Sequence, residues 1–368
     1  MRAVIAIRQI QRHTGAVRNV IEHCKYLKAL GYETTIIAER YNREILDECG
    51  ADFVRIMRWP IKGAYRRTWF DKRVQHWLRA NPYDLFFSHG DSHSNDILVM
   101  HNCVRLHEET CGTPELDVAA FHDSVISAGD YRALITNSKL MADDFQQRYS
   151  VPNDKLRVFY QGVDTSLFNV SDKEALRCKA RRELQLPETS KVVGLITSGD
   201  FTKRNVRFFL EVAGFLAANT SFPIEFLVVG KSNSTRFADQ MSVNGLQSRI
   251  RFIDPVPNVH ELFHALDLHI FPALLEEYGR VVLEGLACGV PTIASDNVGV
   301  AELMQDHSVP EVISGYNLEE WGKAAQNMLT DPDAGKRASQ AAASLAQQYS
   351  MVNQKQAMAD LLSSLIKR

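Results

Sequence analysis

Strand-length apolar runs alternate with helix-length amphipathic segments along this chain, and that alternation limits the folds it can adopt. In the first half, residues 17–30 repeat apolar side chains at helical spacing and stop at Gly31. The apolar runs around them have the length of strands and lie at 3–7, 33–38, 84–88, 97–100 and 132–136. This βαβ rhythm predicts a parallel sheet that helices cover on both faces.

The same rhythm begins again in the second half, after a stretch near residues 162–164. A helical pattern occupies 206–218, and strand-length runs lie at 191–197, 224–229, 250–253, 268–271 and 292–294. A chain of 368 residues is long enough for two domains. The sequence therefore predicts an α/β protein with two Rossmann-like, doubly wound domains, at 1–164 and 165–350. We expect residues 351–368 to form a terminal helix that packs back on the first domain.

Composition argues against several kinds of partner and location. A formal net charge of −2 gives no overall field that would attract nucleic acid. The six cysteines form no CxxC pair or zinc pattern, which suits a reducing cytoplasm. No apolar stretch approaches the ~20 residues that a membrane span needs, and the run at 3–7 is too short for a signal peptide. We therefore expect a cytoplasmic protein that is at most peripheral to the inner face of the cytoplasmic membrane.

The segment 275–295, LEEYGRVVLEGLACGVPTIAS, carries two carboxylates around the start of an apolar helix. Glu276 precedes that helix, and Glu284 lies eight positions later within it. Unpaired amides and the helix dipole favour an anion at such a helix start. A diphosphate would rest on the amides of Tyr278, Gly279, Arg280 and Val281. Glu276 would then bind a sugar hydroxyl and Glu284 a ribose. The alternative is a surface helix with two solvated glutamates.

A second loop, SGDFTKRN at 198–205, follows a predicted strand and precedes a predicted helix. Gly199 and Asp200 begin the turn, and Lys203 and Arg204 offer cations to a phosphate. Basic residues at a helix start are also commonly solvated, so this loop alone is a weak signal.

Together these motifs resemble glycosyltransferase family 4, whose members are retaining enzymes with the GT-B fold of two Rossmann-like domains facing each other across a cleft. The match runs in register with the E-x7-E signature of that family, at Glu276, Tyr278, Gly279, Leu283, Glu284, Ala287, Gly289, Pro291, Ile293, Ala294 and Ser295. Glu277 and Gly285 depart from the usual residues, and Asn205 replaces a usual glycine. The chain is closest in appearance to bacterial lipopolysaccharide-core glucosyltransferases.

The resemblance implies further donor contacts and a mechanism. Backbone groups near Val256 would hold the nucleobase, Gly15 would line the cleft beside the donor, and His101 would reach the transferred sugar. Helix amides, Arg204 and Lys203 would stabilise the leaving diphosphate without a metal or other cofactor. The anomeric configuration would be retained in a front-face reaction, with His101 and Glu276 as the catalytic residues and Glu276 positioning the sugar. Double displacement through a carboxylate stays open as an alternative.

The acceptor half carries a basic stretch laced with aromatic residues at 55–79. It suits a phosphorylated, lipid-linked glycan or glycolipid acceptor, or the anionic inner membrane, and the alternative is a solvated face over ordinary core aromatics. We assign Arg66, Arg67 and Asp91 to the acceptor. The histidines at 89, 93, 101 and 107 lie close in sequence, but their loose spacing favours loop and cleft histidines over a metal site.

The sequence thus predicts transfer of a hexose from a nucleotide sugar, UDP-glucose or a similar UDP-hexose, to a hydroxyl of an envelope glycan such as a heptose-containing lipopolysaccharide core. Two alternatives keep the fold and change the activity: a non-catalytic nucleotide-sugar-binding protein, and an epimerase or phosphorylase. A nicotinamide dehydrogenase is disfavoured because no GxGxxG follows the first predicted strand.

Overall fold

The computed structural model describes residues 1–231, 233–306 and 311–366. It divides the chain into two compact units. The first unit comprises Met1–Gln161 together with the C-terminal segment from Gln354, and the second comprises Gly162–Asn353. The division falls a few residues before position 164, and the last two residues of the predicted terminal helix lie outside the described residues.

The first unit is built on a seven-stranded sheet in the order β5-β3-β1-β6-β7-β8-β9. Every neighbouring pair in it is parallel. The strands are β1 (Arg2–Ala6), β3 (Glu33–Ala38), β5 (Asp52–Arg55), β6 (Leu85–Ser88), β7 (Ile97–Val99), β8 (Ala133–Thr136) and β9 (Leu156–Val158). A short parallel ladder joins β2 (Gln9–Ile10) to β4 (Arg40–Tyr41).

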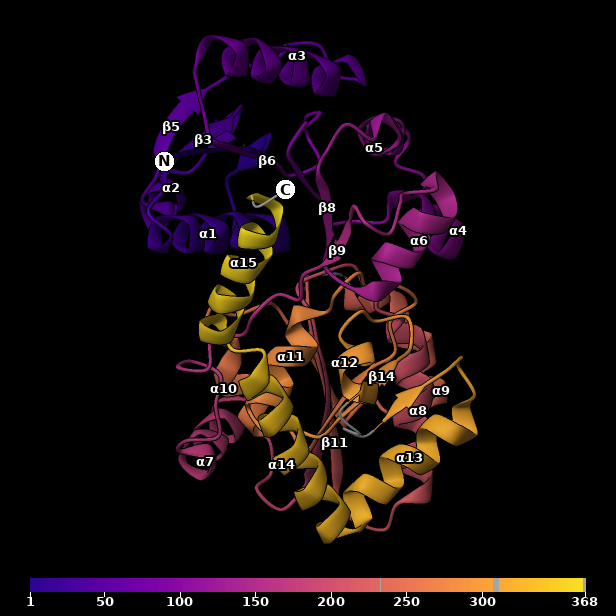
Figure 1. Ribbon diagram of the computed structural model, residues 1–368. Coiled ribbons are helices and arrows are strands. Elements are labelled where there is room, and N and C mark those ends of the chain that lie inside the picture. Colours follow the sequence, from indigo (N-terminus) through magenta and orange to yellow (C-terminus); the bar gives the residue numbers. More distant parts are fainter. Residues whose placement is uncertain (232, 307–310, 367–368) are drawn as a thin grey trace. The chain divides into compact units, whose positions relative to one another are not determined.

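Alternate residues of β1 face opposite layers of helices, as the two-residue period of a strand requires. Ala3 and Ile5 belong to the core beneath α1, whereas Val4 and Ala6 pack toward α3. The helices of this unit are α1 (Gly15–Ala29), α2 (Arg43–Cys49), α3 (Tyr65–Ala80), α4 (Val104–Cys111), α5 (Leu116–Ala128), α6 (Lys139–Tyr149) and α15 (Met351–Ile366). Figure 1 shows α1 and α3 on opposite faces of this sheet.

The terminal helix α15 contributes to the core of the first unit. Its buried residues Met358, Leu362 and Leu365 belong to the same hydrophobic cluster as β1, β3, α1 and α2. Residues separated by more than 300 positions thus complete one core.

The second unit repeats the architecture with a six-stranded parallel sheet in the order β12-β11-β10-β13-β14-β15. Its strands are β10 (Lys191–Ile196), β11 (Ile224–Val229), β12 (Ile250–Ile253), β13 (Leu268–Phe271), β14 (Thr292–Ser295) and β15 (Val312–Ile313). The prediction of an α/β fold with two parallel, doubly wound sheets is confirmed.

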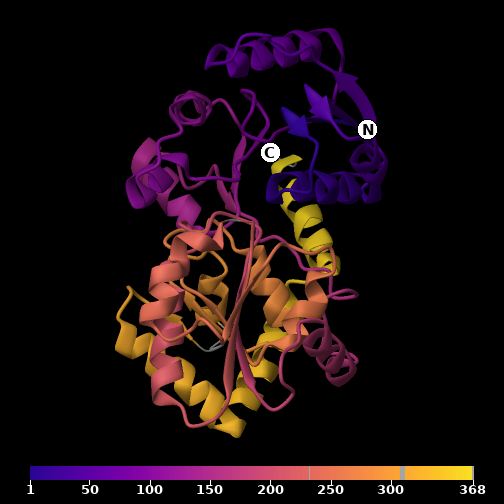
Figure 2. The same cartoon turned by 180° about the vertical axis from the view of Figure 1, so that it is seen from behind.

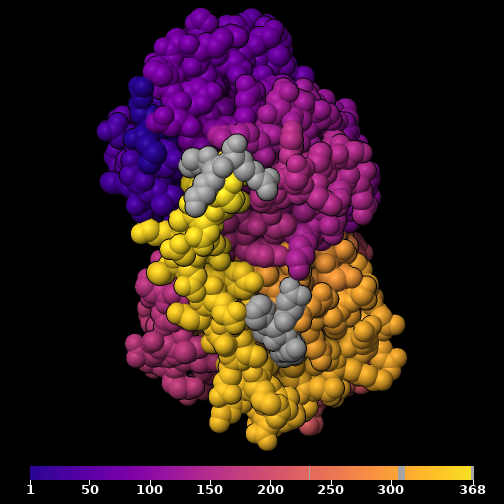
Figure 3. Space-filling view, viewed as in Figure 1, coloured from indigo at the N-terminus to yellow at the C-terminus, as the bar shows by residue number. Residues whose placement is uncertain are grey.

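Helices cover both faces of the second sheet (Figures 1 and 2). One core packs α8 and α13 against the strands through Phe209, Leu216 and Trp321. The helical segments of this unit are α7 (Lys173–Glu183), α8 (Val206–Asn219), the 3₁₀ turn η1 (Ser234–Phe237), α9 (Ala238–Val243), α10 (Val259–Ala265), α11 (Arg280–Ala287), α12 (Ala301–Asp306), α13 (Leu318–Thr330) and α14 (Pro332–Gln348). In the space-filling view, α13 and α14 form part of the outer surface of the second unit (Figure 3).

Both sheets reverse their strand order at one point, and such switch points are where open α/β sheets bind ligands. In the first unit the reversal lies between β1 and β6, so the loops beginning at residues 7 and 89 meet there. In the second unit it lies between β10 and β13, which brings together the loops beginning at 197 and 272. Both predicted donor motifs of the second half occupy these two loops.

Candidate functional site

An ion pair joins the two loops at the switch point of the second unit. Arg204, from the loop after β10, binds Glu276, from the loop after β13, through Nη2 and Oε2. Both side chains are largely buried, with 14% and 16% of their surfaces exposed. Burial raises the pKa of the Glu276 carboxyl, and the neighbouring Arg204 guanidinium opposes that rise. The solvated-glutamate alternative is therefore wrong for Glu276.

Arg204 keeps donor capacity after making this pair. Its Nε and Nη1 atoms are buried, and no hydrogen-bond partner reaches them within the described part of the chain. Its guanidinium lies 5.8 Å from the centre of the Phe271 ring, which supports the planar group from one side. Buried guanidinium nitrogens without partners are costly, so this arrangement is poised for an incoming acceptor such as a phosphate oxygen.

The loop that carries Arg204 is shaped by its own turns. Gly199 N donates to Thr197 Oγ1 at 2.9 Å, and a side chain at Gly199 would approach Arg204 Nη2 to 3.1 Å. Asp200 closes the next turn, because its side chain accepts from Thr202 N at 2.6 Å and its carbonyl accepts from Arg204 N at 3.1 Å. Through these bonds, Gly199 and Asp200 fix the turns of the loop and so position Arg204.

Lys203 is engaged differently from its neighbour. Its Nζ pairs with Glu277 Oε2 at 2.7 Å, and its carbonyl accepts from Leu274 N at 2.9 Å. Glu277 is 5% exposed and stands where the resembled family has a small residue. The sequence did not indicate this pairing. The bond to Glu277 occupies the Lys203 ammonium group. Of these two cations, Arg204 is therefore the one with N–H donors available to a ligand.

The helix α11 begins directly after the second loop, at the point predicted from the motif. Gly279 precedes it with a φ of 88°, a left-handed conformation that glycine adopts without strain. Tyr278 is buried, and Arg280 donates from Nη1 to Gly162 O at 3.3 Å. Val281 lies in the first turn of the helix and is half-buried.

Glu284 lies in the second turn of α11 and is 6% exposed. A buried carboxylate on a helix is uncommon unless other groups bind it. The solvated alternative is therefore wrong for Glu284 as well.

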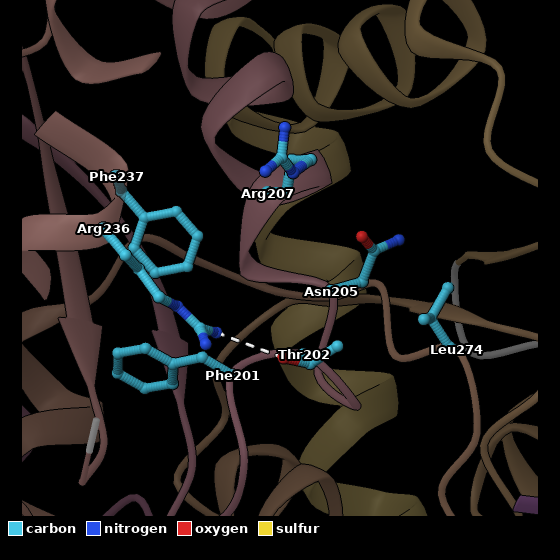
Figure 4. Close-up of a pocket in the computed structure, with 7 residues that line it drawn as sticks. All are labelled: Phe201, Thr202, Asn205, Arg207, Arg236, Phe237 and Leu274. Carbon is cyan, nitrogen blue, oxygen red and sulfur yellow. Dashed lines mark hydrogen bonds between the residues drawn. The ribbon is translucent and has the colours of Figure 1, made fainter. Parts of the chain in front are cut away.

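Two features of the second unit stand apart from the Arg204 cluster. Val256 follows β12 and is 37% exposed, and the described contacts do not connect it to that cluster. A cavity of about 360 Å³ adjoins the first loop, with Arg236 donating to Thr202 Oγ1 at 3.3 Å on one wall (Figure 4). None of the predicted donor residues lines this cavity, whose walls are Phe201, Thr202, Asn205, Arg207, Arg236, Phe237 and Leu274.

The switch point of the first unit forms a polar cavity of about 320 Å³. It brings together three predicted residues, since His101, Arg67 and Asp91 all line it. Arg67 Nη1 pairs with Asp91 Oδ1 at 2.9 Å, and Asp91 Oδ2 accepts from Arg8 N at 2.9 Å. Gly15 begins α1 between two lining residues, Thr14 and Ala16.

His101 belongs to a chain of hydrogen-bonded side chains. Asn19 Nδ2 lies 3.0 Å from His101 Nδ1, and His101 Nε2 lies 2.8 Å from His89 Nδ1. His23 Nδ1 follows at 3.4 Å from His89 Nε2. Burial lowers the pKa of His89 well below its usual range, which keeps that ring neutral. Both ring nitrogens of His101 are therefore engaged inside this unit, and its predicted contact with sugar through a ring nitrogen requires one of these bonds to open.

Arg66, assigned from the sequence to the acceptor together with Arg67, does not line this cavity. Its guanidinium donates to the carbonyls of Trp59 at 3.1 Å and Pro60 at 2.9 Å. Successive residues of a helix point in different directions, so Arg66 and Arg67 of α3 cannot both face one cavity.

The aromatic residues of the basic stretch 55–79 divide between core and surface. Phe70 is fully buried, whereas Trp59, Tyr65 and Trp69 form a cluster with ring centres 5.0 and 5.1 Å apart. Lys72 and Arg73 lie over rings of this cluster, at 5.8 and 5.9 Å. Tyr65 itself is exposed, and so are Met57 and Ile61 in the same stretch.

His93 has a structural partner set of its own. Its Nδ1 lies 2.9 Å from Asp71 Oδ2 and its Nε2 lies 3.2 Å from Ser124 Oγ, and the Asp71 contact raises the His93 pKa. Asp71 lies in α3 and Ser124 lies in α5. His93 therefore joins these two helices through its two ring nitrogens. Among the described residues, no group of three His, Cys, Asp or Glu side chains could hold a metal ion.

Three residues at or near the cavity of the first unit were not predicted from the sequence. Glu39 does not line the cavity, but it comes directly after β3 and pairs with the lining residue Arg8, at 3.4 Å from Arg8 Nε. Its place at a carboxyl strand end is the signal that would have found it. His122 and Glu115 line the cavity, but they lie in or beside α5 at positions no motif marks.

Two family models match the chain and together span most of it. Glycosyltransferase Family 4 matches residues 13–167, and Glycosyl transferases group 1 matches residues 191–331. Within the described residues, no helix has the length and apolar character needed to cross a bilayer.

The similar curated proteins share part of their length with this chain. The D-inositol 3-phosphate glycosyltransferase of Salinispora tropica is 27% identical over 228 residues, which cover 59% of this chain and 46% of that protein. The enzyme of the same name from Stackebrandtia nassauensis is 28% identical over 280 residues, which cover 73% of this chain and 60% of that enzyme. The chain thus spans about half the length of the curated relatives it matches.

Solved structures resemble the whole chain. WaaG, a glycosyltransferase involved in lipopolysaccharide biosynthesis, gives a TM-score of 0.81 at 18% identity, covering 98% of this chain and 99% of WaaG. Anabaena Alr3699/HepE in complex with UDP and glucose gives 0.78 at 17% identity, covering 99% of this chain and 100% of HepE. At such identities these likenesses establish the fold alone. With two parallel-sheet units, the E-x7-E motif in register and both family models matched, the chain belongs to glycosyltransferase family 4 and has the GT-B fold.

Proposed function

We propose that this protein is a retaining glycosyltransferase that moves a hexose from a nucleotide sugar to an acceptor hydroxyl. The observation that carries the proposal is the Arg204–Glu276 pair at the switch point of the second unit, where two buried guanidinium nitrogens have no partner among the residues that the structure describes. A diphosphate would accept from those nitrogens. Glu276, held at the same point, would bind a hydroxyl of the sugar.

A UDP-hexose, such as UDP-glucose, is the donor we propose. HepE, whose fold this chain shares, has been crystallised with UDP-glucose. Glu284, buried on α11, would bind the ribose, and the backbone around Val256 would meet the base.

The proposed chemistry places charge where the second unit can stabilise it. Cleavage of the bond between sugar and phosphate leaves negative charge on the diphosphate and positive charge on the sugar. Arg204 and the first turn of α11 would stabilise the diphosphate. The acceptor would attack from the face that the diphosphate leaves, and a diphosphate oxygen would take its proton, so that configuration is retained. Glu276 then positions the sugar and forms no covalent bond.

On this proposal the reaction needs no metal or other cofactor, because Arg204 and helix amides take the place of a divalent cation. We expect transfer to continue at an unchanged rate after dialysis against EDTA. The measurement is the rate of UDP release with and without the chelator, with added Mg²⁺ as the control. A rate that falls with EDTA and returns with Mg²⁺ would assign the diphosphate to a metal instead.

For the acceptor we propose a glycan of the bacterial envelope, such as a heptose-containing lipopolysaccharide core. The shared fold with WaaG supports this choice, whereas the curated relatives are named for D-inositol 3-phosphate. The exposed residues Met57, Ile61 and Tyr65, with Lys72 and Arg73 beside them, suit docking of the protein on the anionic inner face of the cytoplasmic membrane.

The test is a panel of nucleotide sugars, scored for binding by thermal shift and for turnover. We expect Glu284→Ala to weaken donor binding about 10- to 100-fold, the value of one or two charge-assisted hydrogen bonds. Glu276→Ala should mainly lower turnover. Glu319→Ala, at an exposed position of α13, is the matched control.

Two outcomes would contradict the proposal. Undiminished activity in both the Glu276 and Glu284 variants would remove the donor site. Binding of a nucleotide sugar without turnover, across all donors and acceptors, would favour a non-catalytic binding protein.

A further inference from the structure

The cavity of the first unit contains a histidine that the mechanism does not use. His122 lies on α5, is 9% exposed and lines the cavity. Its Nδ1 is buried and has no hydrogen-bond partner among the residues that the structure describes. Such a group lowers stability unless something outside the chain binds it.

The other side of the His122 ring is fixed by a close backbone. A side chain at Gly90 would lie 3.5 Å from His122 Nε2 and 3.3 Å from Met100 Sδ, and Gly90 has a φ of 75° that favours glycine. A Cβ at Gly90 would be in ordinary van der Waals contact with His122 Nε2, so the Gly90 backbone lies close beside that edge of the ring. Burial, and then Arg67, lower the pKa of His122 to about 4, so the ring is neutral at neutral pH.

The charges that line the cavity balance one another. Two guanidinium groups, Arg8 and Arg67, stand against two carboxylates, Asp91 and Glu115. Each guanidinium is already committed, because Arg67 pairs with Asp91 and Arg8 pairs with the buried Glu39. A phosphate group would compete with a carboxylate for either of these guanidinium groups, although the first turn of α1 adds a partial positive charge.

The remaining polar groups are those that bind hydroxyls. Gln9, Thr14 and Asn102 line the same cavity, and each both donates and accepts hydrogen bonds. A volume of about 320 Å³ equals roughly ten water molecules at ~30 Å³ each, which is enough for one sugar ring. An uncharged ring of hydroxyls meets all of these groups without introducing an unbalanced charge.

We propose that this cavity is an acceptor subsite for one uncharged sugar or polyol ring, and that His122 Nδ1 contacts a hydroxyl of that ring. The inference rests on the proposed function and adds to it the chemical class of the acceptor group. It distinguishes this chain from relatives named for a phosphorylated inositol, since the ring held here carries no phosphate.

The test is a titration of the full-length chain, labelled with ¹⁵N-histidine and followed by NMR. The probes are glucose, mannose and myo-inositol, each compared with its monophosphate, and inorganic phosphate alone. The His122 signals are identified by their loss in His122→Leu. We expect at least one neutral probe to shift them saturably and to bind at least as tightly as its phosphorylated counterpart.

Two variants separate ligand contact from a structural role. We expect His122→Leu to weaken binding of that neutral probe at least about tenfold while leaving Tm unchanged or raised, because it removes a buried polar atom without a partner. His122→Asn keeps a polar atom near the Nδ1 position and should bind within about threefold of the unchanged chain. His76→Leu, at an exposed position on α3, is the control.

The inference fails if no neutral probe moves the His122 signals, if every monophosphate binds more tightly than its neutral counterpart, or if His122→Leu binds like the unchanged chain. These outcomes are independent of turnover. Absence of transfer with every donor would remove the proposed function, whereas failed binding in a chain that still transfers sugar would remove this inference alone.

Discussion

Replacing Arg204 with alanine should lower kcat/KM for the nucleotide sugar by about 100- to 1,000-fold, the effect of deleting one preorganised donor to a developing anion. The side chain pairs with Glu276 and keeps two buried nitrogens without partners in the described residues. Its removal takes away the diphosphate contact and also leaves Glu276 buried without its cation. Loss of that cation should raise the pKa of Glu276 further, since Arg204 is the main group that opposes the effect of burial.

Two companion variants make this measurement specific. Arg204→Lys keeps the charge but cannot present two nitrogens in one plane, so we expect it to recover part of the lost activity. Arg207→Ala removes an exposed arginine only three positions later, at the start of α8, and should leave kcat/KM unchanged. Equal losses in the Arg204 and Arg207 variants would mean that general positive charge, and not the guanidinium at the switch point, binds the donor.

The second large effect is expected on stability, from Gly279→Ala. The backbone there has a φ of 88°, and a new Cβ would lie 2.7 Å from Val298 Cγ1. A left-handed alanine costs roughly 1–3 kcal/mol, and the clash adds about 1–3 kcal/mol more. We therefore expect the free energy of unfolding to fall by roughly 2–6 kcal/mol in urea titrations, with donor binding weakened because Gly279 directly precedes α11.

Gly315 provides a matched control in the same unit. Its φ is 70°, but a Cβ built there meets nothing within 4 Å among the described residues. Gly315→Ala should therefore show the conformational cost alone, and the difference between the two variants measures the contact with Val298. If the two variants lose the same stability, the close approach at Gly279 has no energetic weight.

The fold could be predicted because its signals are local and repeated. Each strand is a short apolar run, and the parallel arrangement follows from the helices between the runs. The position of Glu284 on a helix and of Arg204 in a loop after a strand could likewise be read from the residues around them. Burial could not, because spacing places Glu276 before the helix and Glu284 within it without saying which side chains meet solvent.

The misplaced and missed residues have physical causes of the same kind. Arg66 and Arg67 are neighbours in sequence, yet the helix turns one to the carbonyls of Trp59 and Pro60 and the other to Asp91. Glu277 departs from the motif of the family, and its bond to Lys203, a residue of another loop, could not be predicted from the sequence. His122 could not be found at all, because it lies in α5, far along the chain from Gly90 beside its ring.

The helix α15 has a consequence for how the chain reaches its folded state. The first unit needs Met358, Leu362 and Leu365 in its core, and these residues follow every residue of the second unit in the chain. The first unit therefore cannot close its interior until translation has passed residue 365, whereas every residue of the second unit has been synthesised by then. The first unit thus begins to be synthesised before the second unit, but its core is completed only after the second unit has been synthesised. A fragment ending at Gln161 would present an unfilled groove in place of α15.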